Sequence, residues 1–133
     1  MIPVMQTKMH DPPHSFGNCM WASIASITDI PLDEFPEIFD VDGDSITADG
    51  KTWGTAMRQT LDRYGFEYMG CQPYERACEL SSGVDGYFVV GGESPRGGCG
   101  HAVVFKNGKM VHDPHPDGTG INTIEEAYMI ERT

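Results

Sequence analysis

The chain has 133 residues, of which 39% are hydrophobic and 10% aromatic. This length is typical of one compact domain, and the composition excludes an intrinsically disordered chain. The net charge is -11, from 20 acidic and 9 basic residues. Nucleic acid and anionic membranes are therefore not expected as partners, because the chain lacks the basic surface that neutralises phosphates.

The sequence carries no targeting or cross-linking signal. The opening MIPVMQTKMH lacks the basic start and apolar core of a secretory signal, and no segment approaches the roughly 18 apolar residues of a membrane span. The cysteines, at positions 19, 71, 78 and 99, form no CxxC pair. We therefore expect a cytoplasmic protein with one domain over residues 1–133, without a disulfide framework or a four-cysteine zinc site.

The first half of the chain predicts helices. The segment up to Phe16 contains three prolines and no regular period, so we expect an extended chain on the surface. Residues 20–27 are apolar or small on every face, which predicts a helix buried in the core, with Asn18 capping it through its side chain. A short helix is expected from Pro31 through Ile38. The acidic segment 40–51 departs from the calcium-loop pattern, so we expect a solvated loop.

A clearer helix follows. Thr52 is its expected cap, apolar residues recur at helical spacing from Trp53 to Tyr64, and Gly65 suits a left-handed end. The spacing then predicts a strand over 66–69 and a helical turn over 74–78.

The last third predicts mainly strands. We expect one strand over 86–92 and a hairpin over 101–113 with Asn107 and Gly108 at its tip, while 123–132 favours either a helix or a final strand. Helices followed by antiparallel strands are typical of an α+β fold, here a helix packed against a C-terminal antiparallel sheet.

Cys19 lies where a helix is expected to begin. The N–H groups at a helix N-terminus stabilise a thiolate, which is the nucleophilic form of cysteine. A base has to come from another part of the chain, and His101 opens a strand directly after a glycine-rich loop. Asp113, on the second strand of the hairpin, is the candidate for orienting the imidazole.

The register of the hairpin decides whether these residues meet. If Asn107 and Gly108 form a two-residue turn, Lys106 pairs with Lys109 and Asp113 points away from His101. If residues 106–108 form a three-residue loop with a bulge, His101 falls opposite Asp113. We predict the three-residue loop; a tight turn without a compensating bulge would argue against the triad.

An oxyanion formed at Cys19 needs hydrogen-bond donors. The backbone N–H of Cys19 is one, and Gln6 is the candidate for the second. The alternative, that Gln6 is an exposed polar residue, is equally compatible with the sequence.

Histidines near these positions raise the question of a metal. Cys99, His101, His112 and His115 match no common zinc spacing, so we expect no metal and no other cofactor. We interpret His10, His14, His112 and His115 as surface residues and Cys99 as a loop cysteine without a role.

The motifs GNCMWA, GHAVV and HDP together resemble those of the papain-like cysteine peptidases. The resemblance is closer to the small bacteriocin-leader-processing members, in which Asp-Pro follows the strand histidine. The fuller pattern, which spans nearly the whole chain, resembles a set of short phage and bacterial proteins of unassigned role. It implies a papain-like fold with Cys19 as nucleophile, His101 as base, Asp113 as orienting residue and Gln6 in the oxyanion hole.

The chain departs from this pattern in two respects. Thirteen positions separate Gln6 from Cys19, so a longer loop has to intervene than in papain-like enzymes. The chain also lacks room for the second lobe that forms a deep peptide cleft.

The expected function is a cysteine-nucleophile hydrolase that cleaves a peptide, isopeptide or related amide bond of a protein or peptide substrate through an acyl-enzyme. Two alternatives stay open. The same triad also suits acyl transfer to an amine or deamidation of glutamine, and the fold also suits a non-catalytic module that binds a host protein through its acidic surface.

Overall fold

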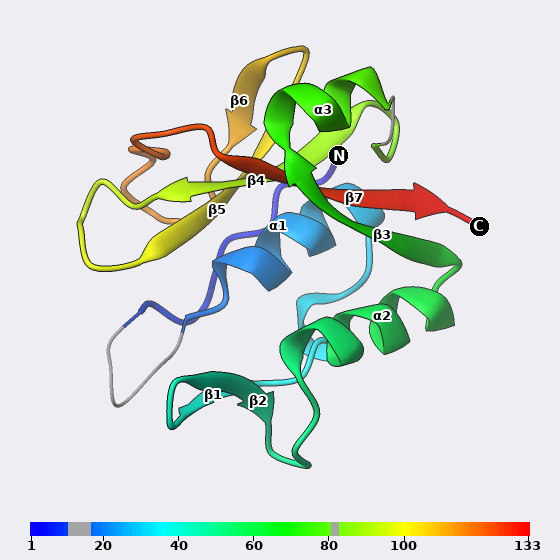
Figure 1. The fold of residues 1–133 in the computed structure, drawn as a ribbon, viewed down its shortest axis with the longest axis vertical. Coiled ribbons are helices and arrows are strands. Elements are labelled where there is room, and N and C mark those ends of the chain that lie inside the picture. Colours follow the sequence, from blue (N-terminus) through cyan, green and yellow to red (C-terminus); the bar gives the residue numbers. More distant parts are fainter. Residues whose placement is uncertain (11–16, 81–82) are drawn as a thin grey trace.

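The computed structural model describes residues 1–10, 17–80 and 83–133. The helices and strands follow one another as α1 Cys19–Thr28, a 3-10 helix Leu32–Glu34, β1 Ile38–Val41, β2 Asp44–Thr47, α2 Trp53–Arg63, β3 Phe66–Pro73, α3 Tyr74–Glu79, β4 Tyr87–Glu93, β5 Gly100–Lys106, β6 Lys109–His112 and β7 Glu126–Arg132. Five of the strands form one sheet in the order β3-β7-β4-β5-β6, with every neighbouring pair antiparallel. The ribbon in Figure 1 shows α1 lying across this sheet. The predicted α+β class, a helix packed against an antiparallel sheet, is confirmed.

Each face of the sheet carries its own core. On one face, α1 and α2 pack against the sheet through Trp21, Ile24, Met57, Leu61 and Val104, among others. On the other face, Ala77 of α3 packs with side chains of β4, β5 and β7. Residues that alternate along β5 therefore contribute to both cores, Val104 to the first and Val103 to the second.

Helix α1 is buried on nearly every side, as its sequence predicts. All eight residues from Trp21 to Thr28 are buried, and Ser23 Oγ donates to the Ala102 carbonyl of β5 at 3.3 Å. The predicted capping role of Asn18 is wrong, because its side chain makes no cap hydrogen bond. Its Oδ1 instead accepts the backbone N–H groups of Thr7 and Lys8, at 3.0 and 2.9 Å. Asn18 thus fastens the opening segment to the start of the helix.

The region between α1 and α2 differs most from expectation. The helix predicted from Pro31 through Ile38 is limited to the 3-10 turn, and Ile38 begins β1. The predicted loop over 40–51 contains the β1–β2 hairpin. Its tip is Asp42-Gly43, with φ angles of +52° and +86°, which is the Asp-Gly turn that suits a tight hairpin.

The remaining predicted elements are close to those observed. Thr52 Oγ1 accepts the N–H of Thr55 at 3.2 Å and caps α2, and Gly65 has the expected positive φ of +80°. Residues 126–132 form a strand, which settles the alternative left open for this segment. Within the described ranges, no helix is long and apolar enough to cross a membrane.

Candidate active site

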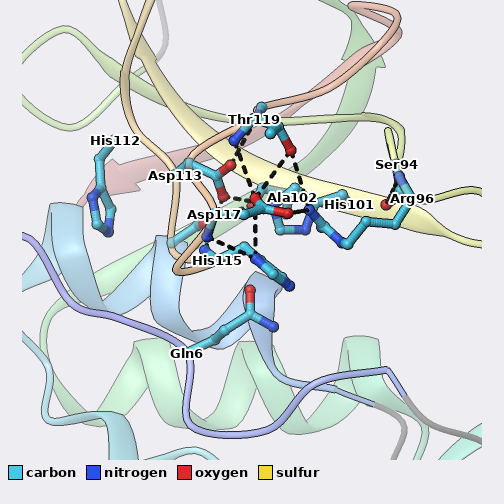
Figure 2. Close-up of polar contacts among 12 residues, drawn as sticks. Gln6, Ser94, Arg96, His101, Ala102, His112, Asp113, His115, Asp117 and Thr119 are labelled. Carbon is cyan, nitrogen blue, oxygen red and sulfur yellow. Dashed lines mark hydrogen bonds and ion pairs between the residues drawn. The ribbon is translucent and has the colours of Figure 1, made fainter.

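His101 and Asp113 meet in the interior. His101 Nε2 lies 2.7 Å from Asp113 Oδ1, and their side chains are only 3% and 2% exposed. The carboxylate also accepts the backbone N–H groups of His115 at 2.9 Å and Gly120 at 2.7 Å, as Figure 2 shows in part. Because this carboxylate is surrounded by donors, we assign the imidazole proton to Nε2, which leaves Nδ1 of a neutral ring free to accept a proton.

The hairpin brings these residues together by a route that the sequence analysis did not predict. The three-residue loop is wrong: Lys106 pairs with Lys109, and the turn is Asn107-Gly108, with φ angles of +53° and +76°. The strands then shift register, because Phe105 pairs with Met110 but Val104 pairs with His112. Val111 is the extra residue of this bulge.

The bulge moves the side chain of Asp113 to the other face of the sheet from the one it would have without the extra residue. Continued from Val104 and His112, the register places Asp113 opposite Val103, and side chains of paired residues share a face. His101 lies two residues before Val103 and so points to that same face at the start of β5. A two-residue turn with a compensating bulge therefore gives the contact that the three-residue loop was expected to give.

Cys19 is the first residue of α1 and lines a cavity of about 550 Å³ together with His101 and Gln6. The thiol lies against the backbone of Ala102, the residue after His101. The structure thus places the thiol beside the strand that carries the base, and not in a hydrogen bond with the imidazole itself. Asp113 lies behind His101, outside the cavity lining.

The electrostatics favour a neutral pair at rest. Burial raises the pKa of the Cys19 thiol, although the backbone N–H groups of Ala102 and Met20 act in the opposite direction. Burial lowers the pKa of His101, against the contribution of Asp113. Burial therefore outweighs the helix N-terminus in its effect on the pKa of Cys19, whereas the position at the helix start favours the thiolate. The imidazole remains available as a base.

Gln6 is buried, so the alternative of an exposed side chain is wrong; the residue is 7% exposed. Its backbone N–H donates to the Pro114 carbonyl at 3.0 Å, which ties the opening segment to the loop that follows Asp113. The amide Nε2 donates to Lys8 O at 3.0 Å and contacts Met9 Sδ at 3.3 Å, while Oε1 is buried without a partner. Residues 11–16 of the intervening loop, which include His14, lie outside the described residues.

His115 is a site residue that the sequence analysis took for a surface histidine. It lines the cavity, and its ring lies edge-on to that of His101 with centroids 6.1 Å apart. His115 Nδ1 lies 3.1 Å from the Asp117 backbone N and 3.0 Å from Asp117 Oδ1, so Asp117 fixes the orientation of the ring. The sequence Asp113-Pro114-His115 does not indicate that His115 lies at the cavity, because its position depends on how the loop after Asp113 folds.

Two loops are joined beside the cavity. Arg96, from the loop between β4 and β5, pairs with Asp117 at 2.7 Å and donates to Thr119 at 3.3 Å. Figure 2 shows Arg96 extending across to these residues. The glycine-rich loop that precedes His101 is therefore joined to the loop that carries His115.

Other cavity residues come from distant elements. Trp53 of α2, Glu126 and Tyr128 of β7, and Cys99 line the same cavity. Helical spacing correctly placed Trp53 on the inner side of α2, but nothing local showed that β7 would lie opposite it. The interpretation of Cys99 as a loop cysteine without a role is not tested by its place in the cavity lining.

The remaining histidine and cysteines lie elsewhere. His112 points away from the site, and its Nε2 contacts Val4 O at 2.8 Å. Cys71 and Cys78 are exposed. In residues 1–10, 17–80 and 83–133, no group of three or more His, Cys, Asp or Glu side chains is arranged to hold a metal ion.

Comparisons of the chain with family models, with curated proteins and with solved structures found no match. What the site does is therefore argued from its geometry and from the motifs themselves.

Proposed function

We propose that this protein is a papain-like cysteine hydrolase that cleaves a peptide, isopeptide or related amide bond through an acyl-enzyme on Cys19. The observation that carries the proposal is the buried His101–Asp113 pair at 2.7 Å, with His101 opening on the same cavity as a cysteine at a helix N-terminus. Base and orienting residue come from one hairpin and the nucleophile from another part of the chain, as nucleophilic catalysis requires.

The reaction begins from the neutral pair. His101 Nδ1 takes the proton of Cys19 as the sulfur adds to the carbonyl carbon, and it then passes that proton to the leaving nitrogen as the C–N bond breaks. Water hydrolyses the resulting thioester with the same base, which releases the acid and restores the thiol. Nδ1 has to come within hydrogen-bond reach of Sγ, a contact that commonly tightens only when substrate is bound.

The backbone N–H of Cys19 is one oxyanion donor, because the first N–H groups of a helix have no partner within it. Gln6 is the proposed second donor. Its Nε2 faces Lys8 O and Met9 Sδ, so to bind an oxyanion the amide has to give up the sulfur, which is the weaker acceptor. The hydrogen bond from the Gln6 backbone N–H to Pro114 O supports this role, because it holds a glutamine thirteen positions before the cysteine beside the loop that follows Asp113.

The test is acylation of the thiol by p-nitrophenyl acetate. We expect a burst of p-nitrophenolate and one acetyl group on Cys19, located by peptide mass spectrometry. Cys19→Ala should abolish the burst, and His101→Ala should slow it by about 100-fold or more.

Cys99→Ala is the matched control, because Cys99 lines the same cavity, and it should leave the burst unchanged. Acetylation of Cys99 in preference to Cys19, or a burst that survives His101→Ala, would contradict the proposal. Product masses obtained with an added amine separate hydrolysis from acyl transfer, and the mass of a glutamine peptide after incubation reveals deamidation.

A further inference from the structure

The cavity extends away from Cys19 toward a second set of side chains. These come from α2 and β7 and form a wall of two rings and a carboxylate, namely Trp53, Tyr128 and Glu126. The rings of Trp53 and Tyr128 meet edge to face with centroids 6.2 Å apart. The thiol and this wall thus belong to one continuous cavity.

The backbone beside this wall is shaped around the tyrosine. Gly91 of β4 lies under Tyr128, and a Cβ on Gly91 would come within 3.2 Å of the ring and 3.3 Å of its hydroxyl. A Cβ there would press on the ring, so glycine at this position lets the ring lie close over the strand.

Glu126 holds its carboxylate in a fixed position. Tyr128 donates its hydroxyl to Oε1 at 3.0 Å, and the Cys71 thiol donates to Oε2 at 3.1 Å. Burial, followed by hydrogen bonding to Glu126, raises the pKa of Cys71 to about 11. Burial and the Glu126 charge also raise the pKa of Tyr128. Both neighbours therefore stay protonated as donors at neutral pH.

Among the described residues, no basic side chain forms an ion pair with Glu126. Arg96, the basic residue of the cavity lining other than the histidines, is already paired with Asp117. Glu125 at the same end adds a second negative charge. A partly buried carboxylate that is bonded to the Tyr128 hydroxyl and shares the cavity with Trp53 favours a cation that has shed part of its water.

We propose that this end of the cavity binds a lysine or arginine side chain of the substrate. The cationic group lies at the Glu126 carboxylate, and the methylene stem lies against the rings of Trp53 and Tyr128. The inference rests on the proposed function only in that it takes Cys19 as the place where the bond is broken. A neutral side chain would displace water from the carboxylate without supplying a positive charge, and an acidic one would be repelled.

The net charge of -11 supports the same substrate class, because an acidic protein raises the local concentration of basic peptides. This long-range attraction follows total charge, however, whereas the proposed contact depends on one carboxylate. The experiment has to separate the two.

Binding is measured with the Cys19→Ala variant, so that no turnover is needed. Blocked pentapeptides Ala-Ala-Xaa-Ala-Ala, with Xaa lysine, norleucine or glutamate, are titrated while tryptophan fluorescence is followed, because Trp53 lies in the cavity. We expect the lysine peptide to bind about tenfold more tightly than the norleucine peptide, and the glutamate peptide to bind most weakly.

Glu126→Gln in the same background should remove the preference for lysine, because the amide keeps the shape and loses the charge. Glu131→Gln is the matched control: it removes the same charge from the same strand, at a residue outside the cavity lining. It should leave the preference intact. Glu126→Asp, which keeps the charge but moves it back by one methylene, should weaken the preference and guards against a folding defect in Glu126→Gln.

Equal binding of the three peptides, or a lysine preference that survives Glu126→Gln, would overturn the inference. A preference that both glutamine variants reduce equally would assign it to total charge and would overturn it as well. Because binding is read without chemistry, a lysine preference that depends on Glu126 stands even if p-nitrophenyl acetate fails to acylate Cys19. In that event the proposed hydrolysis falls and the cation site remains.

Discussion

Replacing Asp113 by asparagine separates the two roles that its carboxylate has. Oδ1 accepts from His101 Nε2 and from the His115 N–H, and Oδ2 accepts from the Gly120 N–H. An amide has one oxygen, so its NH2 group has to face either the Gly120 N–H or the His101 side. The first orientation sets two donors against each other. The second sets the NH2 group against the His115 N–H, which shares Oδ1 with His101, and it also forces the imidazole proton from Nε2 to Nδ1, which leaves the base unable to accept the proton of Cys19.

The expected loss of stability follows from these bonds. Hydrogen bonds to a charged group contribute about 1.5–3 kcal/mol each, and a buried donor left without an acceptor costs about 1–3 kcal/mol. The substitution removes one hydrogen bond and makes the other two neutral. Removing a buried charge acts in the opposite direction, because the charge is costly to bury. We therefore expect Asp113→Asn to lower the free energy of unfolding by about 2–4 kcal/mol. Acylation of Cys19 should fall by about 10³-fold or more, by analogy with the same replacement in serine triads.

Urea unfolding followed by tryptophan fluorescence measures the first quantity, and the p-nitrophenolate burst measures the second. Asp85→Asn is the control, since Asp85 forms an exposed ion pair with Arg132 and should change the unfolding free energy by less than about 1 kcal/mol. If Asp113→Asn matches the wild type within 1 kcal/mol and acylates at the same rate, the carboxylate neither holds the loop nor orients the base, and the reasoning is refuted.

Three further changes test the structure. Because burial lowers the pKa of His101 below its ordinary 6.5, acylation of Cys19 should be lost with a midpoint below pH 6.5 in a pH–rate profile. The unfolded chain protonates this residue first, so its contribution to stability is present above pH 6.5 and is lost as the pH falls; a midpoint above 6.5 would contradict the burial argument. Gly92→Ala should lower the unfolding free energy by more than about 3 kcal/mol, since a Cβ would lie 1.8 Å from the Thr123 carbonyl oxygen. Gly54→Ala, whose nearest such neighbour is a flexible arginine end at 3.8 Å, should raise it by about 0.5–1 kcal/mol in the same denaturation assay. Thr52→Ala should cost about 1 kcal/mol through loss of the α2 cap, and an unchanged melting curve would show that this cap is dispensable.

The elements that could be predicted are those whose signals are local. Continuous small and apolar residues predicted the burial of α1, and Thr52 with Gly65 marked the ends of α2 closely. The β1–β2 hairpin was not predicted because its Asp-Gly turn lies within an acidic run, which is typical of a solvated or calcium-binding loop. Its first strand, β1, is also largely exposed, so hydrophobic alternation is weak there.

The walls of the cavity could not be predicted, because they depend on strand order. Glu126 and Tyr128 lie on the last strand, which inserts between β3 and β4 in the middle of the sheet. Consecutive strands pair with each other more often than not, so the sequence favours β7 next to β6. Trp53 contacts Tyr128 only because β7 lies between β3 and β4 and not beside β6.

The hairpin of β5 and β6 shows why a correct contact can follow from an incorrect register. Side chains alternate between the two faces of a sheet, so one extra residue between His101 and Asp113 is enough to bring both onto the same face. That residue can lie in the turn or in the strand. Asn107-Gly108 strongly favours a two-residue turn because both residues accept positive φ, so the extra residue moves into the strand. Val111 tolerates that position because its side chain is 45% exposed and no core packing opposes the bulge. The alternation of side chains is restored by the time the chain reaches Asp113, where the carboxylate is enclosed by donors and the geometry has to be exact.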